Sequence, residues 1–217
     1  TGGAGFIGCN AAAHNLAKGN TVTIFDNLSR PRTQHNLDWL RAQPGAERLT
    51  AVIGDVREPA MIQSAMAEAQ PDWVLHLASQ TAVTTSVKNP REDFEINAFG
   101  TFNVLEAARN LATPPAVFYS STNKVYGGME DVALVEEPAR YHFRDFPDGI
   151  DESRPLDFHS PYGCSKGAGD QYVRDYSRIY GMRTVVFRQS TIYGLRQFGV
   201  EDQGWLAWMT IAAVTGR

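Results

Sequence analysis

The chain has 217 residues, of which 43% are hydrophobic and 20% are charged, and its formal net charge is −4. This length can bury a full core and the composition is ordinary for a globular protein, so we expect one domain or slightly more. The mild acidity gives no basic surface for nucleic acid or an anionic membrane, and no apolar run is long enough to span a bilayer. We therefore expect the protein to bind neither nucleic acid nor a membrane.

The cysteines and histidines indicate neither a disulfide framework nor a metal site. Cys9 and Cys164 do not form a CxxC pair. The five histidines show no metal-ligand spacing, so we expect no bound metal. A reducing cytoplasm is the simplest compartment for such a chain.

A glycine-rich stretch opens the chain, with Gly2, Gly5 and Gly8 at the spacing GxxGxxG. Glycines allow the backbone to turn tightly and approach a pyrophosphate, whose charge sits at the N-terminus of the following helix. We expect that helix over residues 9–18, and the apolar run 22–25 predicts a buried parallel strand. Because such a loop should follow a hydrophobic strand, we expect the sequence to be part of a longer protein.

Acidic residues after two strands strengthen this interpretation, since glycine-rich turns alone are common. Asp26 ends the strand at 22–25, where a carboxylate can bind both hydroxyls of a ribose. The same charge repels a 2′-phosphate and favours NAD over NADP, although Arg30 nearby weakens that preference a little. Asp55 follows a strand at 49–53 and could contact the adenine edge; the alternative is a simple turn former at a strand end.

Strands and helices alternate along the rest of the chain, which predicts an α/β fold with a doubly wound parallel sheet. Further strands are expected at 73–77, 116–119 and 184–187, and helices at 59–69, 92–111 and 161–180. Residues 128–160 break the alternation and are expected to be an irregular functional insertion on the substrate side. We assign 1–197 to a dinucleotide-binding domain. Residues 198–217, with a helix from 205, are assigned to the start of a substrate-binding lobe that is largely absent.

Tyr162 and Lys166 stand four residues apart on an expected helix, which puts both side chains on one face. A neighbouring ammonium favours the phenolate and brings the pKa of the phenol, normally near 10, toward working pH. A hydroxyl from Thr122 could hold the oxygen that loses or gains the proton. The constellation is suited to alcohol oxidation with hydride removal.

Two of these residues also have simpler interpretations. Lys166 alone would be a solvated surface lysine, but its order after the glycine turn, Asp26 and Thr122 argues against coincidence. Asn97 lies inside an expected helix, where it is not the best helix former. It is either exposed or bonded to backbone or water near the site.

With these residues assembled, the sequence resembles the extended short-chain dehydrogenase/reductase family of NAD-dependent sugar-nucleotide epimerases and dehydratases, over essentially all 217 residues. The resemblance implies a Rossmann-like fold, NAD as cofactor, and Thr122, Tyr162 and Lys166 as the catalytic residues. It implies that the cofactor site comprises Gly2, Gly5, Phe6, Ile7, Gly8, Asp26, Asn27, Ser29, Arg30, Asp55, Val56, Leu77, Ala78, Gln80 and Asn97, together with Tyr162 and Lys166. It implies substrate contacts at Thr84, Thr122, Asn123, Thr191 and Arg196.

Longer strings at 25–30, 120–127, 156–166 and 202–205 resemble members that epimerise a CDP-linked sugar at C2. We therefore expect a nucleotide-sugar substrate, with a CDP-sugar favoured. The alternatives are a UDP-sugar 4-epimerase and, more distantly, a non-catalytic dinucleotide-sensing module, although such modules usually lose the tyrosine or lysine. Dehydratases of the family follow the triad threonine with Asp-Glu, where this chain has Asn123-Lys124. Thr191 stands where many members carry an asparagine that contacts the nucleotide diphosphate. The family also implies a homo-oligomer, either a dimer or a tetramer.

Overall fold

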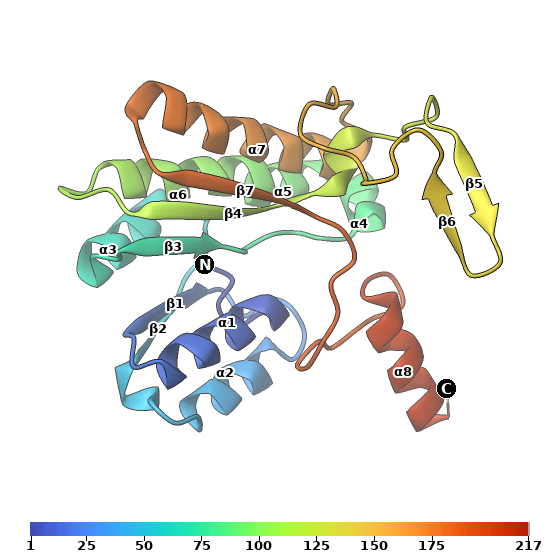
Figure 1. The fold of residues 1–217 in the computed structure, drawn as a ribbon. Helices are drawn as coiled ribbons and strands as arrows, with labels where there is room; N and C mark the ends of the chain where they lie inside the picture. Colours follow the sequence, from blue (N-terminus) through green and yellow to red (C-terminus); the bar gives the residue numbers. More distant parts are fainter. Residues whose placement is uncertain (217) are drawn as a thin grey trace.

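Parallel strands with helices packed against them form the body of the protein in a computed structural model that describes residues 1–216 (Figure 1). β1 (Val22–Asp26) pairs with β2 (Leu49–Ile53), and β4 (Ala116–Thr122) lies between β3 (Trp73–His76) and β7 (Thr184–Gln189). All of these pairs are parallel. The α/β fold with parallel strands is therefore confirmed.

The first two residues lie between the two groups of strands. The Gly2 N–H donates to the carbonyl of Phe25 on β1 over 2.8 Å. The Thr1 backbone nitrogen donates to the carbonyl of Leu75 on β3, and the Leu77 N–H donates to the Thr1 carbonyl. Backbone hydrogen bonds thus connect β1 to β3 through Thr1 and Gly2.

Helices cover the sheet from both sides. α1 (Phe6–Ala17) and α2 (Thr33–Arg41) pack together, and α3 (Pro59–Ala69), α6 (Gly100–Arg109) and α7 (Ser160–Tyr180) pack beside one another (Figure 1). α7 begins with Pro161 in its first turn, where the missing N–H costs no helical hydrogen bond. It ends at Gly181, whose φ of 66° suits a left-handed cap.

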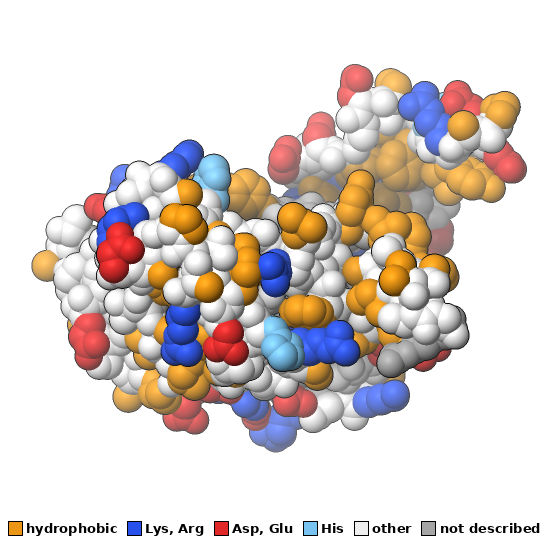
Figure 2. Space-filling model, turned by 90° about the horizontal axis from the view of Figure 1, so that it is seen from below, with side chains coloured by type: hydrophobic (Ala, Val, Ile, Leu, Met, Phe, Trp, Pro, Cys, Tyr) orange, Lys and Arg blue, Asp and Glu red, His pale blue; other side chains and the backbone are white. Residues whose placement is uncertain are grey.

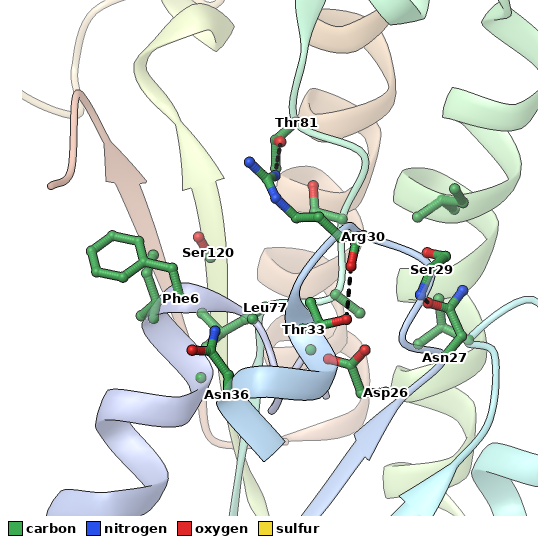
Figure 3. Close-up of a pocket in the computed structure, with 18 of the residues that line it drawn as sticks. Phe6, Asp26, Asn27, Ser29, Arg30, Thr33, Asn36, Leu77, Thr81 and Ser120 are labelled. Atoms are coloured by element: carbon green, nitrogen blue, oxygen red, sulfur yellow. Dashed lines mark hydrogen bonds between the residues drawn. The ribbon is translucent and has the colours of Figure 1, made fainter. Parts of the chain in front are cut away.

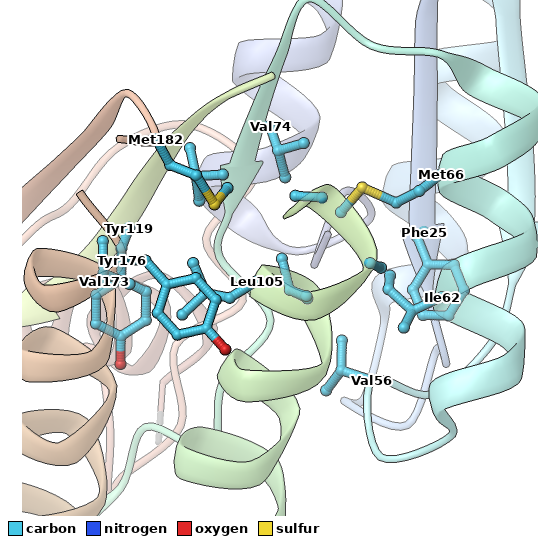
Figure 4. Close-up of a cluster of buried hydrophobic side chains, with 14 of the residues drawn as sticks. Phe25, Val56, Ile62, Met66, Val74, Leu105, Tyr119, Val173, Tyr176 and Met182 are labelled. Carbon is cyan, nitrogen blue, oxygen red and sulfur yellow. The ribbon is translucent and has the colours of Figure 1, made fainter. Parts of the chain in front are cut away.

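Neighbouring residues of β1 pack into different clusters, because side chains alternate between the two faces of a strand. Ile24 belongs to a cluster with Cys9 and Leu37 from α1 and α2. Phe25 belongs to the larger cluster with Ile62 of α3 and Leu105 of α6 (Figure 4). The sheet is therefore buried on both faces at β1, as a parallel strand requires.

The expected helix over 92–111 is divided in the structure. α5 (Pro90–Phe94) is followed by a π-helical turn, η2 (Glu95–Phe99), and then by α6. Such single π turns widen a helix locally and often occur at functional sites. The turn contains Asn97, whose side chain bonds to the segment after β3.

Two short helices were not expected from the sequence. α2 contains mostly polar residues, and Leu37 and Leu40 are its only buried apolar side chains. α4 (Val83–Lys88) is rich in β-branched residues, which have low helix propensity. Tertiary packing determines both helices, as it commonly does for short ones.

The expectation of an irregular stretch over 128–160 was wrong in part. β5 (Leu134–Glu137) and β6 (Arg140–Phe143) form an antiparallel hairpin within it. Each strand has only four residues, too few for a clear alternation of apolar and polar side chains. The hairpin projects from the body, as Figures 1 and 2 show.

Most of the remaining expected elements are present with small shifts at their ends. β2 and α3 have the expected bounds, α1 begins three residues early, β4 extends to Thr122, and β7 extends to Gln189. Short 3-10 turns cover Ala46–Arg48 and Asn123–Tyr126. The expected helix from 205 is α8 (Trp205–Thr215), and Arg217 lies outside the described residues. Apolar side chains of α8, including Met209 and Val214, are exposed.

Candidate functional site

A cavity lies at the carboxyl ends of β1, β3 and β4, beside the start of α1 (Figure 3). This is the edge at which open parallel sheets bind their ligands. Most of the residues predicted for the cofactor line it: Gly2, Gly5, Phe6, Ile7, Gly8, Asp26, Asn27, Ser29, Arg30, Asp55, Val56, Leu77, Ala78, Tyr162 and Lys166. Segments up to about 160 residues apart in the sequence thus meet at one site, as the spacing of the motifs predicts.

The glycine turn needs its glycines for close packing. Gly2 has a φ of 68°, and a Cβ there would lie 2.6 Å from the Ala78 nitrogen. A Cβ on Gly8 would collide with the Gly2 carbonyl oxygen. α1 starts at Phe6 without a side-chain cap, so its first-turn N–H groups are available to an anion in the cavity. This arrangement fits a pyrophosphate.

Asp26 is held rigidly at the end of β1. One carboxylate oxygen accepts from the Ala4 N–H at 3.0 Å, and the other accepts from the Leu28 N–H at 2.8 Å. Each oxygen keeps a further lone pair for a hydroxyl group. The carboxylate is therefore placed to receive ribose hydroxyls, which fits a dinucleotide.

Asp55 lies on the next strand end and remains ionised. Arg57 donates to it from Nε and Nη2, and these hydrogen bonds lower the pKa of Asp55 to about 2. Asn27 donates to the same carboxylate at 2.8 Å. The loops after β1 and β2 are thereby joined along the cavity wall.

Arg30 and Arg196 approach the cavity from different loops. The Arg30 guanidinium donates to Thr81 Oγ1 at 3.2 Å (Figure 3). It also contacts the Gln203 side chain. The Arg196 guanidinium lies 4.4 Å from the centre of the Trp39 ring. Both residues line the cavity and bring positive charge to it.

Thr122, Tyr162 and Lys166 come from β4 and from the first turns of α7. Lys166 is 3% exposed, and its ammonium lies 4.3 Å from the centre of the Tyr119 ring. Burial lowers the pKa of Lys166 to about 7, and the charges of Asp93 and Asp170 oppose that shift. The lysine is therefore close to its titration point at neutral pH.

The expected lowering of the Tyr162 pKa is opposed by burial. Burial raises the pKa of the phenol, and a hydrogen bond involving Thr122 acts in the opposite direction. The Tyr162 backbone N–H donates to Ser86 Oγ at 3.1 Å, which joins the start of α7 to α4. Of the three side chains predicted to be catalytic, those of Tyr162 and Lys166 line the cavity, and Thr122 lies outside its lining but beside the phenol.

Asn97 and Gln80 do not line the cavity but bond to each other behind it. The Asn97 amide oxygen accepts from the Gln80 N–H at 2.9 Å, and its nitrogen donates to the Gln80 carbonyl at 3.0 Å. Asn97 is 1% exposed, so the alternative that it is simply a surface residue was wrong. Its role is contact with the backbone beside the site.

The five predicted substrate residues are less closely grouped. Asn123 directly follows Thr122, with 3.5 Å between the Asn123 Oδ1 and Thr122 Oγ1 atoms. Arg196 lines the cavity, whereas Thr84 and Thr191 are exposed and lie outside its lining. Thr84 contacts Asp202 in the loop before α8.

Some residues of the site were missed from the sequence. Asn36 is 1% exposed and lines the cavity; its nitrogen donates to the Ala4 carbonyl, and its oxygen has no partner among residues 1–216. It belongs to α2, a helix that was not among the elements expected from the sequence. Asp93 and Ser165 are also buried behind the site, and only their position next to predicted residues could have singled them out.

Within residues 1–216, no helix is long and apolar enough to cross a membrane, and no cluster of side chains suitable for a metal ion is found. The fold and the glycine turn define a dinucleotide-binding α/β protein. Residues 1–202 match the family model described as GDP-mannose 4,6 dehydratase, and the chain belongs to this family of NAD-dependent nucleotide-sugar epimerases and dehydratases.

Individual relatives agree with this assignment. The chain is 50% identical over 214 residues to the CDP-paratose 2-epimerase of Salmonella typhi, covering 99% of this chain and 62% of that protein. It resembles the UDP-glucose 4-epimerase of Thermotoga maritima crystallised with UDP-glucose, with a TM-score of 0.80 and 26% identity over 100% of this chain and 62% of that one. For the UDP-glucose 4-epimerase of Thermus thermophilus in complex with NAD, the TM-score is 0.70 and the identity 32%, over 90% and 55%. The chain thus spans about three fifths of the length of these relatives.

Proposed function

We propose that the protein is an NAD-dependent nucleotide-sugar epimerase that converts CDP-paratose to CDP-tyvelose by inversion at C2. The observation that carries this proposal is that Tyr162 and Lys166 line the same cavity as the glycine turn and Asp26, with Thr122 in hydrogen-bond contact with Tyr162. The 50% identity to a CDP-paratose 2-epimerase over almost the whole chain supports the choice of substrate.

NAD fits the residues that are present. The uncapped start of α1 would hold the pyrophosphate, Asp26 the adenine ribose, and Lys166 the nicotinamide ribose. When bound, NAD supplies a group that accepts a hydride from the sugar carbon and returns it. The carboxylate of Asp26 disfavours a 2′-phosphate at the same position.

The protein's own residues handle the proton. Tyr162, as the phenolate, removes the proton from the C2 hydroxyl and later returns it to the same oxygen. Lys166 favours the phenolate by its charge, and Thr122 orients the sugar oxygen by a hydrogen bond. The 2-keto sugar must present its opposite face between the two steps, so that the configuration at C2 is inverted.

Dehydration is disfavoured by the residues that follow Thr122. Water elimination needs an acid and a base next to the sugar, and dehydratases of the family carry Asp-Glu there. This chain has Asn123-Lys124, whose amide and ammonium do not form such a pair. We therefore favour epimerisation, although the family model is described by a dehydratase.

A UDP-sugar 4-epimerase is the second candidate function, because the fold matches two UDP-glucose 4-epimerases. The full-length protein should be assayed with CDP-paratose and UDP-glucose side by side, and the products resolved by NMR. We expect CDP-paratose alone to be converted, without added NADH. Conversion of UDP-glucose alone would replace the proposal by its rival.

We further propose a cytoplasmic homo-oligomer, a dimer or tetramer. Phe99, Tyr172 and Tyr180 are exposed on η2 and α7, and the aromatic rings of Phe102 and Tyr172 contact edge to face. Clustered exposed aromatic side chains are typical of protein interfaces. Light scattering of the full-length protein would test this association, and a monomeric mass would contradict it. The division into a cofactor domain (1–197) and the start of a substrate lobe (198–217) stays a prediction.

A further inference from the structure

Asp93 is a buried carboxylate that no step described so far employs. It lies on α5, is 1% exposed, and forms no salt bridge within the described residues. Burying a carboxylate is costly unless hydrogen bonds compensate. An apolar side chain would fill the same space with a smaller loss of free energy on burial, so we infer that the carboxylate itself has a role.

The hydrogen bonds of Asp93 reach residues behind two walls of the cavity. Its Oδ1 accepts from the Gln80 side-chain amide at 2.7 Å and from the Asn97 amide at 3.2 Å. Its Oδ2 accepts from the hydroxyl of Ser165. Gln80 belongs to the turn after β3, whose neighbours Leu77 and Ala78 line the cavity.

Ser165 is the residue immediately before Lys166 and three residues after Tyr162. Its oxygen also accepts from the Asn97 amide at 3.1 Å, so the link from α5 to α7 is doubled. The wall that carries the proton-transferring residues and the wall formed by the turn at 77–80 are therefore tied to one carboxylate.

We propose that Asp93 is a positioning residue, which fixes the spacing between the turn at 77–80 and the Tyr162–Lys166 segment of α7. The inference rests on the proposed epimerase function. Hydride and proton transfer depend steeply on such spacing, because a displacement of about 1 Å can lower a rate by about 100-fold. Asp93 does not line the cavity, so binding should depend on it far less.

The test compares variants of the full-length protein. Asp93→Ala and Ser165→Ala each remove one end of the link, and the double variant shows whether they act together. Tyr176→Phe is the matched control, because it removes a single α6–α7 hydrogen bond, from Tyr176 to Glu106, at the other end of α7. Asp93→Asn keeps an acceptor for the two amides and the size of the side chain.

For Asp93→Ala we expect kcat to fall by about 10- to 100-fold, with KM and the affinity for added NAD within about threefold of wild type. Ser165→Ala should lower kcat similarly, and the double variant should be no slower than the slower single variant, as for residues of one network. Asp93→Asn should stay within about fivefold of wild type, and Tyr176→Phe should retain full activity.

An unchanged kcat in a folded Asp93→Ala protein would overturn the inference. So would a double variant whose fall in kcat equals the product of the two single falls. A fall in kcat for Asp93→Asn as large as that for Asp93→Ala would overturn it as well. If Asp93→Ala does not fold, Ser165→Ala and Asp93→Asn carry the same test. Hydrogen exchange gives a readout without substrate: Asp93→Ala should speed exchange in 77–82 and 160–168, and Tyr176→Phe should not. Inactivity of the wild type towards both sugars would reject the proposed function, whereas unchanged exchange would reject the role of Asp93.

Discussion

Arg188 on β7 donates hydrogen bonds to both carboxylate oxygens of Asp170 on α7, with 2.9 Å from Nε to Oδ2 and 3.0 Å from Nη2 to Oδ1. Ser121, the neighbour of Thr122, donates to the same carboxylate at 2.8 Å. Asp170 is fully buried. The helix that carries Tyr162 and Lys166 is thereby attached to the strand that carries Thr122.

Replacing Arg188 by Met should destabilise the protein by about 3–5 kcal/mol, because the Asp170 carboxylate would stay buried without its cation. Denaturant unfolding of the full-length protein measures the loss. Arg91→Met is the control: its ion pair with Glu95 is largely exposed and should be worth about 1 kcal/mol or less. Equal losses for the two variants would contradict the buried-pair argument.

Replacing Tyr162 by Phe should lower turnover by about 100- to 10,000-fold, the usual contribution of a positioned acid or base. Binding of NAD should persist, because the ring remains and only the hydroxyl is lost. Product formation and calorimetric titration with NAD measure the two properties, and Tyr141→Phe on the exposed hairpin serves as the control. Turnover at the wild-type rate would remove Tyr162 from the mechanism, and a protein that binds NAD without turnover in its wild-type form would be the sensing module.

Replacing Asp26 by Ala should weaken NAD binding at least tenfold, since the carboxylate that receives the ribose hydroxyls and holds the Ala4 and Leu28 amides is lost. The preference for NAD over NADP should shrink in the same variant, because the repulsion of a 2′-phosphate disappears. Titration with each dinucleotide tests both effects. Asp38→Ala, on the exposed side of α2, should bind as the wild type does, and equal behaviour of the two variants would contradict this role of Asp26.

Lys166 should make the cofactor-free protein more stable as the pH rises from about 7 to about 10. Its pKa is about 7 in the folded protein and about 10.5 in the unfolded chain, so between these values the unfolded chain binds the extra proton. The stabilising contribution is complete above the unfolded pKa and is lost as the pH falls through 7.

Unfolding by denaturant at pH 7 and pH 9.5, in wild type and Lys166→Met, isolates this contribution. The free energy of unfolding of the wild type should rise with pH relative to that of the variant. Lys18→Met, at an exposed position after α1, should follow the wild type. A constant difference between wild type and Lys166→Met at both pH values would show that the pKa of the lysine is not lowered by folding.

Much of the sheet and of the cofactor site follows from local sequence. Buried parallel strands such as β1 are continuous apolar runs, and Asp26 or Asp55 directly after a strand indicates the ligand-binding edge. The glycine turn and the Tyr162–Lys166 spacing carry their geometry within a few residues. These features need no knowledge of distant contacts.

Features that depend on distant partners were harder to predict. The π turn contains Asn97, whose side-chain amide bonds to the Gln80 backbone. No local sequence pattern predicts this contact. Asp93 gave no signal, because a charged residue near a helix start is usually a solvated cap. Burial also changed the expected chemistry: it raises the pKa of Tyr162, which spacing alone did not indicate.

Thr1 and Gly2 form backbone hydrogen bonds with both β1 and β3, so they join two groups of strands at the edge of the cavity. A dinucleotide bound between Asp26 and Lys166 would bridge the β1–β2 pair and the β3–β4–β7 group, which Thr1 and Gly2 also join. Separation of the groups would then have to release the ligand, so each tenfold gain in affinity would oppose that separation by about 1.4 kcal/mol. Tight retention of the cofactor and resistance of the two strand groups to separation would be two measures of one free energy.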